Sequence, residues 1–321
     1  MKKPSRLAAL LLLATFFAPL GAGAAELVPV YTPPAGGTYF VLGAGMVTVN
    51  NRYSQDVKFV QEATTGTMDI VRRMVQRAGE SKPAFGLYGS PDAWNAYKGQ
   101  GDYVGKPFGT LRAVVSGPGT DVYLVVPASS PIKSYADAKG KRLGMGGPGS
   151  TPANTAQFLL DQHGVTKKDF KPYYYTYKET SEGIQDGSLD GGFLAGSYPV
   201  AAMTELSSRT DIRIVPVDDA VLKKVLPEYP YYYRNVVKPK AYKGVEQDTP
   251  VMGFGGGVWT YESVGDDLVY QFVKNLFEHK EDFYSIHPAA KWMTPQTAMF
   301  GASVPFHPGA LKYFKEIGVA R

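Results

Sequence analysis

Short apolar runs that end in a polar, glycine-rich loop and continue as a helix recur along this chain. The run 57–63 leads through Thr64-Thr65-Gly66-Thr67 into an amphipathic helix over 68–78. The run 84–88 leads through Gly89-Ser90-Pro91 into a helix over 93–97. A similar unit spans residues 27–51, near the start of the chain. Strand, loop and helix in this order predict a parallel sheet flanked by helices.

A second α/β region follows two strands predicted over 111–116 and 121–126. Its predicted parts are a strand over 142–145, the glycine loop 146–151, a helix with Ala156, Leu159 and Leu160 on one face, and strands over 190–194 and 212–217. The segment 220–249, rich in Tyr, Pro and Lys, is predicted as a helix followed by irregular chain. A strand over 251–260 and an amphipathic helix over 263–278 then return to the first region.

We therefore expect an α/β fold of two doubly wound lobes, joined by two crossing strands, with a ligand cleft between them. Lobe 1 is predicted to be discontinuous, with residues 26–126 and 251–321, and lobe 2 to comprise residues 127–250.

The first 25 residues have the pattern of a cleavable secretory signal peptide. A positive start with Lys2, Lys3 and Arg6 precedes an apolar run of about 14 residues, shorter than the roughly 20 of a membrane-spanning helix. Cleavage removes three of the 34 basic and none of the 29 acidic residues, which lowers the net charge from +5 to +2. We expect an exported periplasmic protein that neither binds nucleic acid nor is embedded in a membrane.

Glycine-rich loops with hydroxyl side chains lie at the predicted strand ends, which form the ligand edge of an α/β sheet. Free N–H groups at the following helix N-termini favour a small, anionic, hydrogen-bonding ligand, although any single loop could be only a turn or a cap. The candidate ligand-binding residues are Gly37, Thr38, Tyr39, Thr67, Ser90, Asp92, Gly149, Ser150, Thr151, Ser197 and Tyr198. Among them, we expect Ser150 and Thr151 to hold a carboxylate.

Motifs for catalysis, metal binding or nucleotide binding are missing from the sequence. The chain has no Cys, no Gly-x-Ser-x-Gly and no His-Glu-x-x-His, and the loop 146–151 lacks the Gly-Lys-Ser/Thr ending of a nucleotide loop. The four histidines, His163, His279, His287 and His307, are scattered and are predicted to have surface or packing roles. We therefore predict a protein that is not an enzyme and that uses no cofactor or metal.

Aromatic clusters permit two interpretations. Tyr173 to Tyr175 and Tyr231 to Tyr233 could stack on a sugar, but packing at a lobe interface is the more common role. Trp94 and Tyr97 are either core residues or part of the cleft.

Several motifs in this order resemble the TAXI family of solute receptors of tripartite ATP-independent periplasmic (TRAP) transporters. They are Gly-Gly-Thr-Tyr-Phe at 36–40, Thr-Gly-Thr at 65–67, Gly-Gly-Pro-Gly-Ser-Thr at 146–151, Asp-Gly-Ser-Leu-Asp-Gly at 186–191 and Pro-Phe-His-Pro-Gly-Ala at 305–310. The resemblance extends along essentially the whole chain after residue 25.

The resemblance implies a type II periplasmic binding-protein fold that closes on a small organic anion by a hinge motion. It implies a carboxylate ligand, such as glutamate or 2-oxoglutarate, delivered to a sodium-driven TRAP permease without ATP or catalysis. Matched by position, the pocket loops of the family hold Thr38, Tyr39, Thr67, Ser90, Ser150 and Thr151. The substrate-binding subunit of an ATP-driven importer, and a periplasmic enzyme on a similar scaffold, remain alternatives.

Overall fold

The computed structural model describes residues 26–35 and 37–320, so the predicted signal peptide lies outside the described residues. Ten strands form one hydrogen-bonded sheet, with the order β2-β1-β3-β10-β4-β7-β5-β6, while β8 pairs with β4 and β9 with β10. The strands are β1 (Glu26–Thr32), β2 (Val57–Ala63), β3 (Phe85–Gly89), β4 (Leu111–Pro127), β5 (Arg142–Gly144), β6 (Lys171–Tyr173), β7 (Gly191–Gly196), β8 (Ile212–Val215), β9 (Tyr232–Val237) and β10 (Thr249–Tyr261).

Helices connect most of these strands. The α-helices are α1 (Thr38–Tyr53), α2 (Thr67–Gly79), α3 (Ser90–Lys98), α4 (Thr151–Gln162), α5 (Tyr177–Asp186), α6 (Ala201–Arg209), α7 (Asp219–Glu228), α8 (Asp266–Glu278), α9 (Lys280–Tyr284) and α10 (Pro308–Glu316). Three short 3-10 helices are η1 (Gly101–Tyr103), η2 (Tyr135–Ala138) and η3 (Pro288–Trp292).

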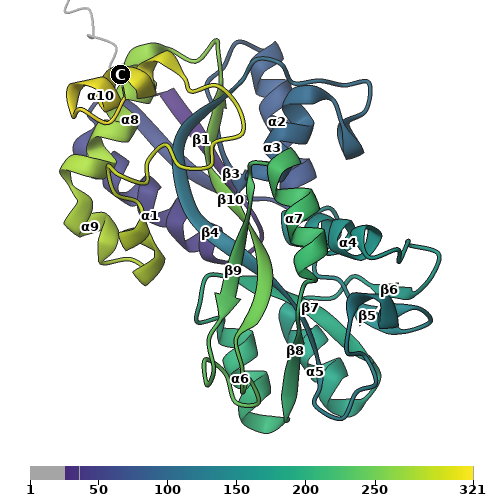
Figure 1. The fold of residues 1–321 in the computed structure, drawn as a ribbon. Coiled ribbons are helices and arrows are strands. Elements are labelled where there is room, and N and C mark those ends of the chain that lie inside the picture. Colours follow the sequence, from purple (N-terminus) through teal and green to yellow (C-terminus); the bar gives the residue numbers. More distant parts are fainter. Residues whose placement is uncertain (1–25, 36, 321) are drawn as a thin grey trace, which may run out of the picture.

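The molecule has two lobes that share the long strands β4 and β10 (Figure 1). One hydrophobic cluster contains residues between Val28 and Val115 and between Val258 and Phe314, which we call lobe 1. Two further clusters contain residues between Val122 and Phe254, which we call lobe 2. Along β4 the chain passes from the lobe 1 core to the lobe 2 core between Val115 and Val122, and along β10 it returns between Phe254 and Val258. The lobe limits at 126/127 and 250/251 stay a prediction.

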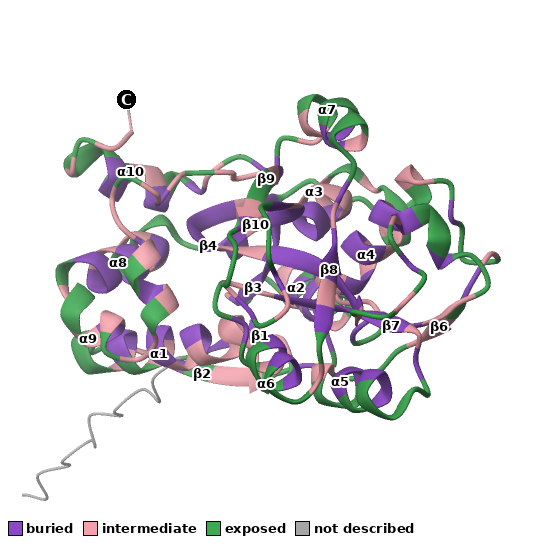
Figure 2. Cartoon of the chain, turned by 60° about the horizontal axis from the view of Figure 1, so that its bottom comes forward, coloured by how far each residue is buried: buried purple, intermediate pink, exposed green. Residues whose placement is uncertain are grey.

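Helices cover both faces of the sheet, as predicted. On β3, a Cβ at Gly86 would meet Ile70 and Met74 of α2, whereas a Cβ at Gly43 of α1 would lie 3.5 Å from the side chain of Leu87. Because successive residues of a strand point to opposite faces, α1 and α2 lie on opposite sides. The buried residues follow the strands and the inner sides of the helices, and the outer helix turns are exposed (Figure 2).

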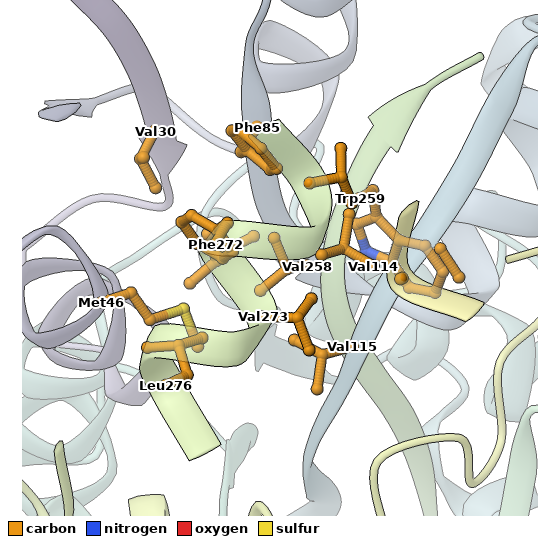
Figure 3. Close-up of a cluster of buried hydrophobic side chains, with 14 of the residues drawn as sticks. Val30, Met46, Phe85, Val114, Val115, Val258, Trp259, Phe272, Val273 and Leu276 are labelled. Atoms are coloured by element: carbon orange, nitrogen blue, oxygen red, sulfur yellow. The ribbon is translucent and has the colours of Figure 1, made fainter. Parts of the chain in front are cut away.

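Aromatic packing anchors α8 in the core of lobe 1 (Figure 3). The rings of Phe272 and Phe85 stack with centroids 4.5 Å apart, and Phe59 meets Phe272 edge to face at 5.4 Å. Phe272 is fully buried, so its side chain contributes about 2–3 kcal/mol of transfer free energy to folding. The apolar period of the segment 263–278 corresponds to the buried face of α8, which includes Val269, Phe272, Val273 and Leu276.

The prediction of two separate strands over 111–116 and 121–126 was wrong, because β4 is continuous. Gly117-Pro118-Gly119 reads as a turn in the sequence but lies extended in the strand. Opposite it, the pairing with β10 shifts register between Phe254 and Gly256, so Pro118 occupies an irregularity where its missing N–H is tolerated.

The predicted irregular chain after the helix in 220–249 was also wrong in part. Residues Tyr232–Val237 form β9, which pairs antiparallel with Thr249 to Phe254 of β10. The ladder with β10 imposes the extended form on this segment, although its sequence has no clear alternation of apolar and polar residues.

Candidate functional site

The N-termini of α2 in lobe 1 and α4 in lobe 2 meet at the boundary between the lobes. The Thr67 and Thr151 Oγ1 atoms are 3.2 Å apart, and both residues are only 3% exposed. The backbone N–H of Gly89 also donates to Thr151 Oγ1, at 3.3 Å. Two hydroxyls predicted as ligand groups therefore contact each other, and the lobes are closed at this point.

A buried carboxylate extends this contact. Asp92, on the first turn of α3, is 1% exposed and its Oδ1 accepts a hydrogen bond from Asn154 Nδ2 of α4 at 3.2 Å. Asn154 also donates to Asp102 Oδ2 at 3.4 Å. Burial raises the pKa of Asp92 to about 6, against the lowering effect of hydrogen bonds from Thr151 and Asn154. The hydrogen bond between Asp92 and Asn154 therefore links lobe 1 to lobe 2.

Three other predicted residues make hydrogen bonds within the chain. Ser90 Oγ donates to Gly301 O at 3.2 Å. Tyr39 OH donates to Pro118 O at 2.8 Å, and burial raises its pKa. Ser150 is the N-cap of α4, where its Oγ accepts from Ala153 N at 3.3 Å and donates to Gly147 O at 2.7 Å.

The remaining predicted residues of the glycine loops lie at helix starts. Gly37 is the N-cap of α1 and Thr38 is its first residue. Gly149 has a φ of +64°, a conformation that favours glycine, and its Cα faces the side chain of Met68 from lobe 1. The loop before α4 therefore also touches lobe 1.

A hollow of about 750 Å³ lies beside β4, β9 and β10, where the chain passes between the lobes. Ser197 and Tyr198 are the predicted residues that border it, and Ser197 Oγ donates to Gly119 O at 2.6 Å. Its lining residues are Gly117, Pro118, Gly119, Asp121, Ser197, Tyr198, Pro199, Tyr233, Arg234, Asn235, Gly255, His287, Pro288, Ala289, Trp292 and Phe300. A second hollow of about 350 Å³ shares Asp121, Tyr198 and Asn235 with it and adds Lys238 and Lys240.

The two parts of the site are adjacent through β10. Gly255 borders the larger hollow, and a Cβ at this position would lie 3.3 Å from Ser90 Oγ and 3.4 Å from Gly301 O. Phe300, the residue before Gly301, also borders the hollow. The hollow is therefore next to the strand end that carries Ser90 and Asp92.

Basic groups outnumber acidic groups around the two hollows. Arg234, Lys238 and Lys240 are the basic residues, and Asp121 is the acidic one among the described lining residues. The Arg234 side chain is 45% exposed and lies 3.5 Å from Asp219. Asp121 Oδ2 accepts from Tyr123 OH and Asn235 Nδ2, at 3.1 and 2.7 Å, and its Oδ1 is buried. Lys238 pairs with Asp248 at 3.0 Å, so two of the three basic residues have an acidic partner outside the lining, and the lining itself carries more basic than acidic side chains.

His287 adds a donor to the hollow. Its Nδ1 accepts a hydrogen bond from Ala289 N at 3.1 Å, so the proton of the neutral ring is on Nε2. His307 has the same capping role at α10, where its Nδ1 accepts from Gly309 N at 3.1 Å. In residues 26–35 and 37–320, no group of three or more acidic or histidine side chains is arranged to hold a metal ion.

Sequence reasoning missed Asn154 and most of the larger hollow. Tyr233 belongs to a cluster noted in the sequence, whose other members Tyr231 and Tyr232 are buried in lobe 2, with Trp94 of α3 packed against Tyr231. Trp292 and Phe300 lie in a segment with little regular structure, so no periodic pattern marks them. None of the helices in the described part of the chain is long and apolar enough to cross a membrane.

Comparison with known proteins identifies relatives in sequence and in fold. The NMT1-like family matches residues 30–318. A TctC solute-binding protein from Polaromonas, solved without ligand, is 15% identical, with 84% of this chain and 88% of that chain covered and a TM-score of 0.50.

The sulfonate-binding protein SsuA of an ABC transporter from Methylobacillus flagellatus KT is 19% identical, with 92% and 88% covered and a TM-score of 0.46. SsuA from Xanthomonas axonopodis pv. citri, bound to MOPS, is 14% identical, with 92% of both chains covered and a TM-score of 0.47. At such identities the likeness concerns the fold alone, and the likeness to the Polaromonas solute-binding protein agrees with the two-lobed arrangement described above.

Proposed function

The chain belongs to the NMT1-like family, a periplasmic solute-binding family, and we propose that it captures a small organic anion between its lobes. Capture involves a hinge motion about β4 and β10, the two strands that contribute to both cores. A solute that contacts both lobes stabilises the closed form, because it binds that form better than the open one.

The larger hollow is the observation that supports this proposal best. Its lining combines Trp292 and Phe300 of lobe 1, Ser197 and Tyr198 of lobe 2, and residues of the strands between them. Its volume of about 750 Å³ lies within the roughly 300–1,000 Å³ typical of small-molecule sites. A molecule in the hollow would contact both lobes at once.

The charge of the lining favours an anion. Arg234 is 45% exposed and its contact to Asp219 is long, at 3.5 Å, and the Nε2–H of His287 is a further donor in the same lining. Carboxylates such as glutamate and 2-oxoglutarate, which the TAXI resemblance implies, carry such acceptors. The hydroxyl contact between Thr67 and Thr151 then forms part of the closing surface, and the predicted carboxylate site at Ser150 and Thr151 remains a proposal.

We propose a sodium-driven TRAP permease as the membrane partner, on the strength of the TAXI resemblance. An ATP-driven importer with a receptor of the same fold is the alternative. Uptake of radiolabelled solute by cells that express the receptor with its neighbouring transport genes separates the two. Collapse of the sodium gradient stops uptake by a TRAP system, whereas ATP depletion at a constant gradient stops uptake by an importer.

The protein is proposed to act in the periplasm, after removal of residues 1–25, and to bind without converting its solute. A time course of the bound compound by mass spectrometry tests the second point. Recovery of the unchanged compound after prolonged incubation is the expected result, and a new product would reveal an enzyme.

A thermal-shift screen against organic acids, sulfonates, sugars and neutral aromatics tests the anion receptor, because a ligand of the native state raises the melting temperature. Arg234→Gln should lower the affinity for the acid with the largest thermal shift about tenfold, as loss of a charged hydrogen bond does. Arg209→Gln is the matched control, since Arg209 is also exposed and paired, with Glu205 at 3.0 Å, but lies on α6 away from the hollow lining. A shift with sugars alone would contradict the proposal.

A further inference from the structure

We infer that the preferred solute carries a planar aromatic ring next to its acid group, an inference that rests on the proposed anion receptor. Three aromatic side chains border the larger hollow from separate segments: Tyr198 before α6, Trp292 at the end of η3, and Phe300. Together with Tyr233 of β9, they place four aromatic side chains around the hollow, from segments of both lobes.

Two of these side chains are unusually exposed for their size. Phe300 is 63% exposed and Tyr198 is 59% exposed. Burial of large apolar surface against a ligand is favourable, and water covers this surface when the hollow is empty. The exposed rings are therefore the part of the lining that gains most from an apolar ligand group.

Neighbouring rings fix the orientation of the exposed ones. Phe300 lies against Trp292 with centroids 6.4 Å apart and planes at 68°. Tyr198 lies against Tyr242 with centroids 5.6 Å apart and planes at 74°. Rings held at steep angles offer both faces and edges to a third ring, and aromatic pairs prefer edge-to-face or offset-stacked contacts. An aromatic ring gains these contacts, whereas a saturated ring of equal size gains only burial.

The donor groups that border the hollow favour an acid. Arg234, the His287 Nε2–H and the indole N–H of Trp292 are donors. Asp121 is the acidic residue of the described lining; its Oδ2 accepts two hydrogen bonds, and its buried Oδ1 has no hydrogen-bond partner. The donors and the neighbouring rings together match an aromatic carboxylate or sulfonate.

Isothermal titration calorimetry of the exported chain with five probes tests this inference. The probes are benzoate, cyclohexanecarboxylate, benzamide, glutamate and 2-oxoglutarate. Benzoate should bind about tenfold more tightly than the saturated acid and the neutral amide. It should also quench tryptophan fluorescence, and the quench should disappear in Trp292→Phe, which retains Trp94 and Trp259.

Variants test the rings directly. Phe300→Leu should lower the affinity for benzoate about tenfold and the affinity for cyclohexanecarboxylate by less than about threefold. Tyr174→Leu is the matched control, because Tyr174 is an exposed aromatic residue outside the hollow, and its affinities should equal those of the natural chain. Phe300 is largely exposed, so its replacement should not unfold the protein.

The outcomes separate the two proposals. Equal affinity for benzoate and cyclohexanecarboxylate, or tighter binding of 2-oxoglutarate or glutamate, overturns the aromatic class and leaves the anion receptor standing. Binding of benzamide alone overturns both.

Discussion

Asp92 on α3 accepts a hydrogen bond from Asn154 on α4 across the boundary between the two lobes, with 3.2 Å between Oδ1 and Nδ2. The carboxyl group is almost completely buried and has Asp102, a second acceptor of Asn154, nearby. Opening of the lobes would break this hydrogen bond and admit water to Asp92. The protonation of one side chain is thereby coupled to the position of the lobes.

The first prediction is that acid favours closure. The pKa of Asp92 is raised from 3.8 to about 6 in the closed form, mainly by burial, and water should return it toward 3.8 in the open form. Between these values the closed form binds more protons, so closure is favoured as the pH falls through about 6, by at most about 3 kcal/mol. Tyr88 and Tyr103 face the same carboxylate, but burial raises their pKa values and keeps them neutral in this range.

Small-angle scattering of the ligand-free protein measures this effect. The radius of gyration should be smaller at pH 5 than at pH 7.5, and Asp92→Asn should remove the difference. Asp69→Asn is the control, because Asp69 pairs with Arg72 and Arg73 on its own helix and its pKa is lowered. An unchanged pH response in Asp92→Asn would mean that another group is responsible.

The second prediction concerns Thr151→Val. Valine has nearly the same shape but cannot accept from Gly89 N or bond to Thr67 Oγ1, so the closed form is left with an unsatisfied buried N–H. Such a group costs about 1–3 kcal/mol, and solute affinity should fall about tenfold or more, as calorimetry can measure. Thr204→Val is the control, since the Thr204 hydroxyl donates to Val200 O within lobe 2. Undiminished affinity would exclude Thr151 from closure and from the site.

The third prediction concerns the core of lobe 1. Phe272→Ala should lower the free energy of unfolding by about 3–5 kcal/mol, because the cavity between Phe59 and Phe85 cannot close fully. Urea unfolding followed by circular dichroism measures the loss. Gln271→Ala, at an exposed position of the same helix, should cost much less, and similar costs would contradict the assignment of the buried face.

Local patterns predicted α2, β3, α8 and β10 from the sequence because each has its own period or strong turn signals. The continuity of β4 was not predictable, since Gly117-Pro118-Gly119 has every feature of a turn and only the partner strand makes it extended. The hydroxyl loops were identified by their position at strand ends. Whether Thr67 and Thr151 face a ligand or each other depends on the lobe position, which no local pattern encodes.

The fourth prediction tests why β4 needs glycine at 117. A Cβ at Gly117 would come within 2.9 Å of Tyr39 OH and 3.1 Å of its ring, so Gly117→Ala should cost about 1–3 kcal/mol through overpacking. In a Tyr39→Ala background the ring is absent, and the same substitution should be nearly neutral, because alanine is tolerated in an extended strand. A double-mutant cycle from urea unfolding measures this coupling. Equal costs in both backgrounds would show that strand conformation, rather than the Tyr39 ring, requires the glycine.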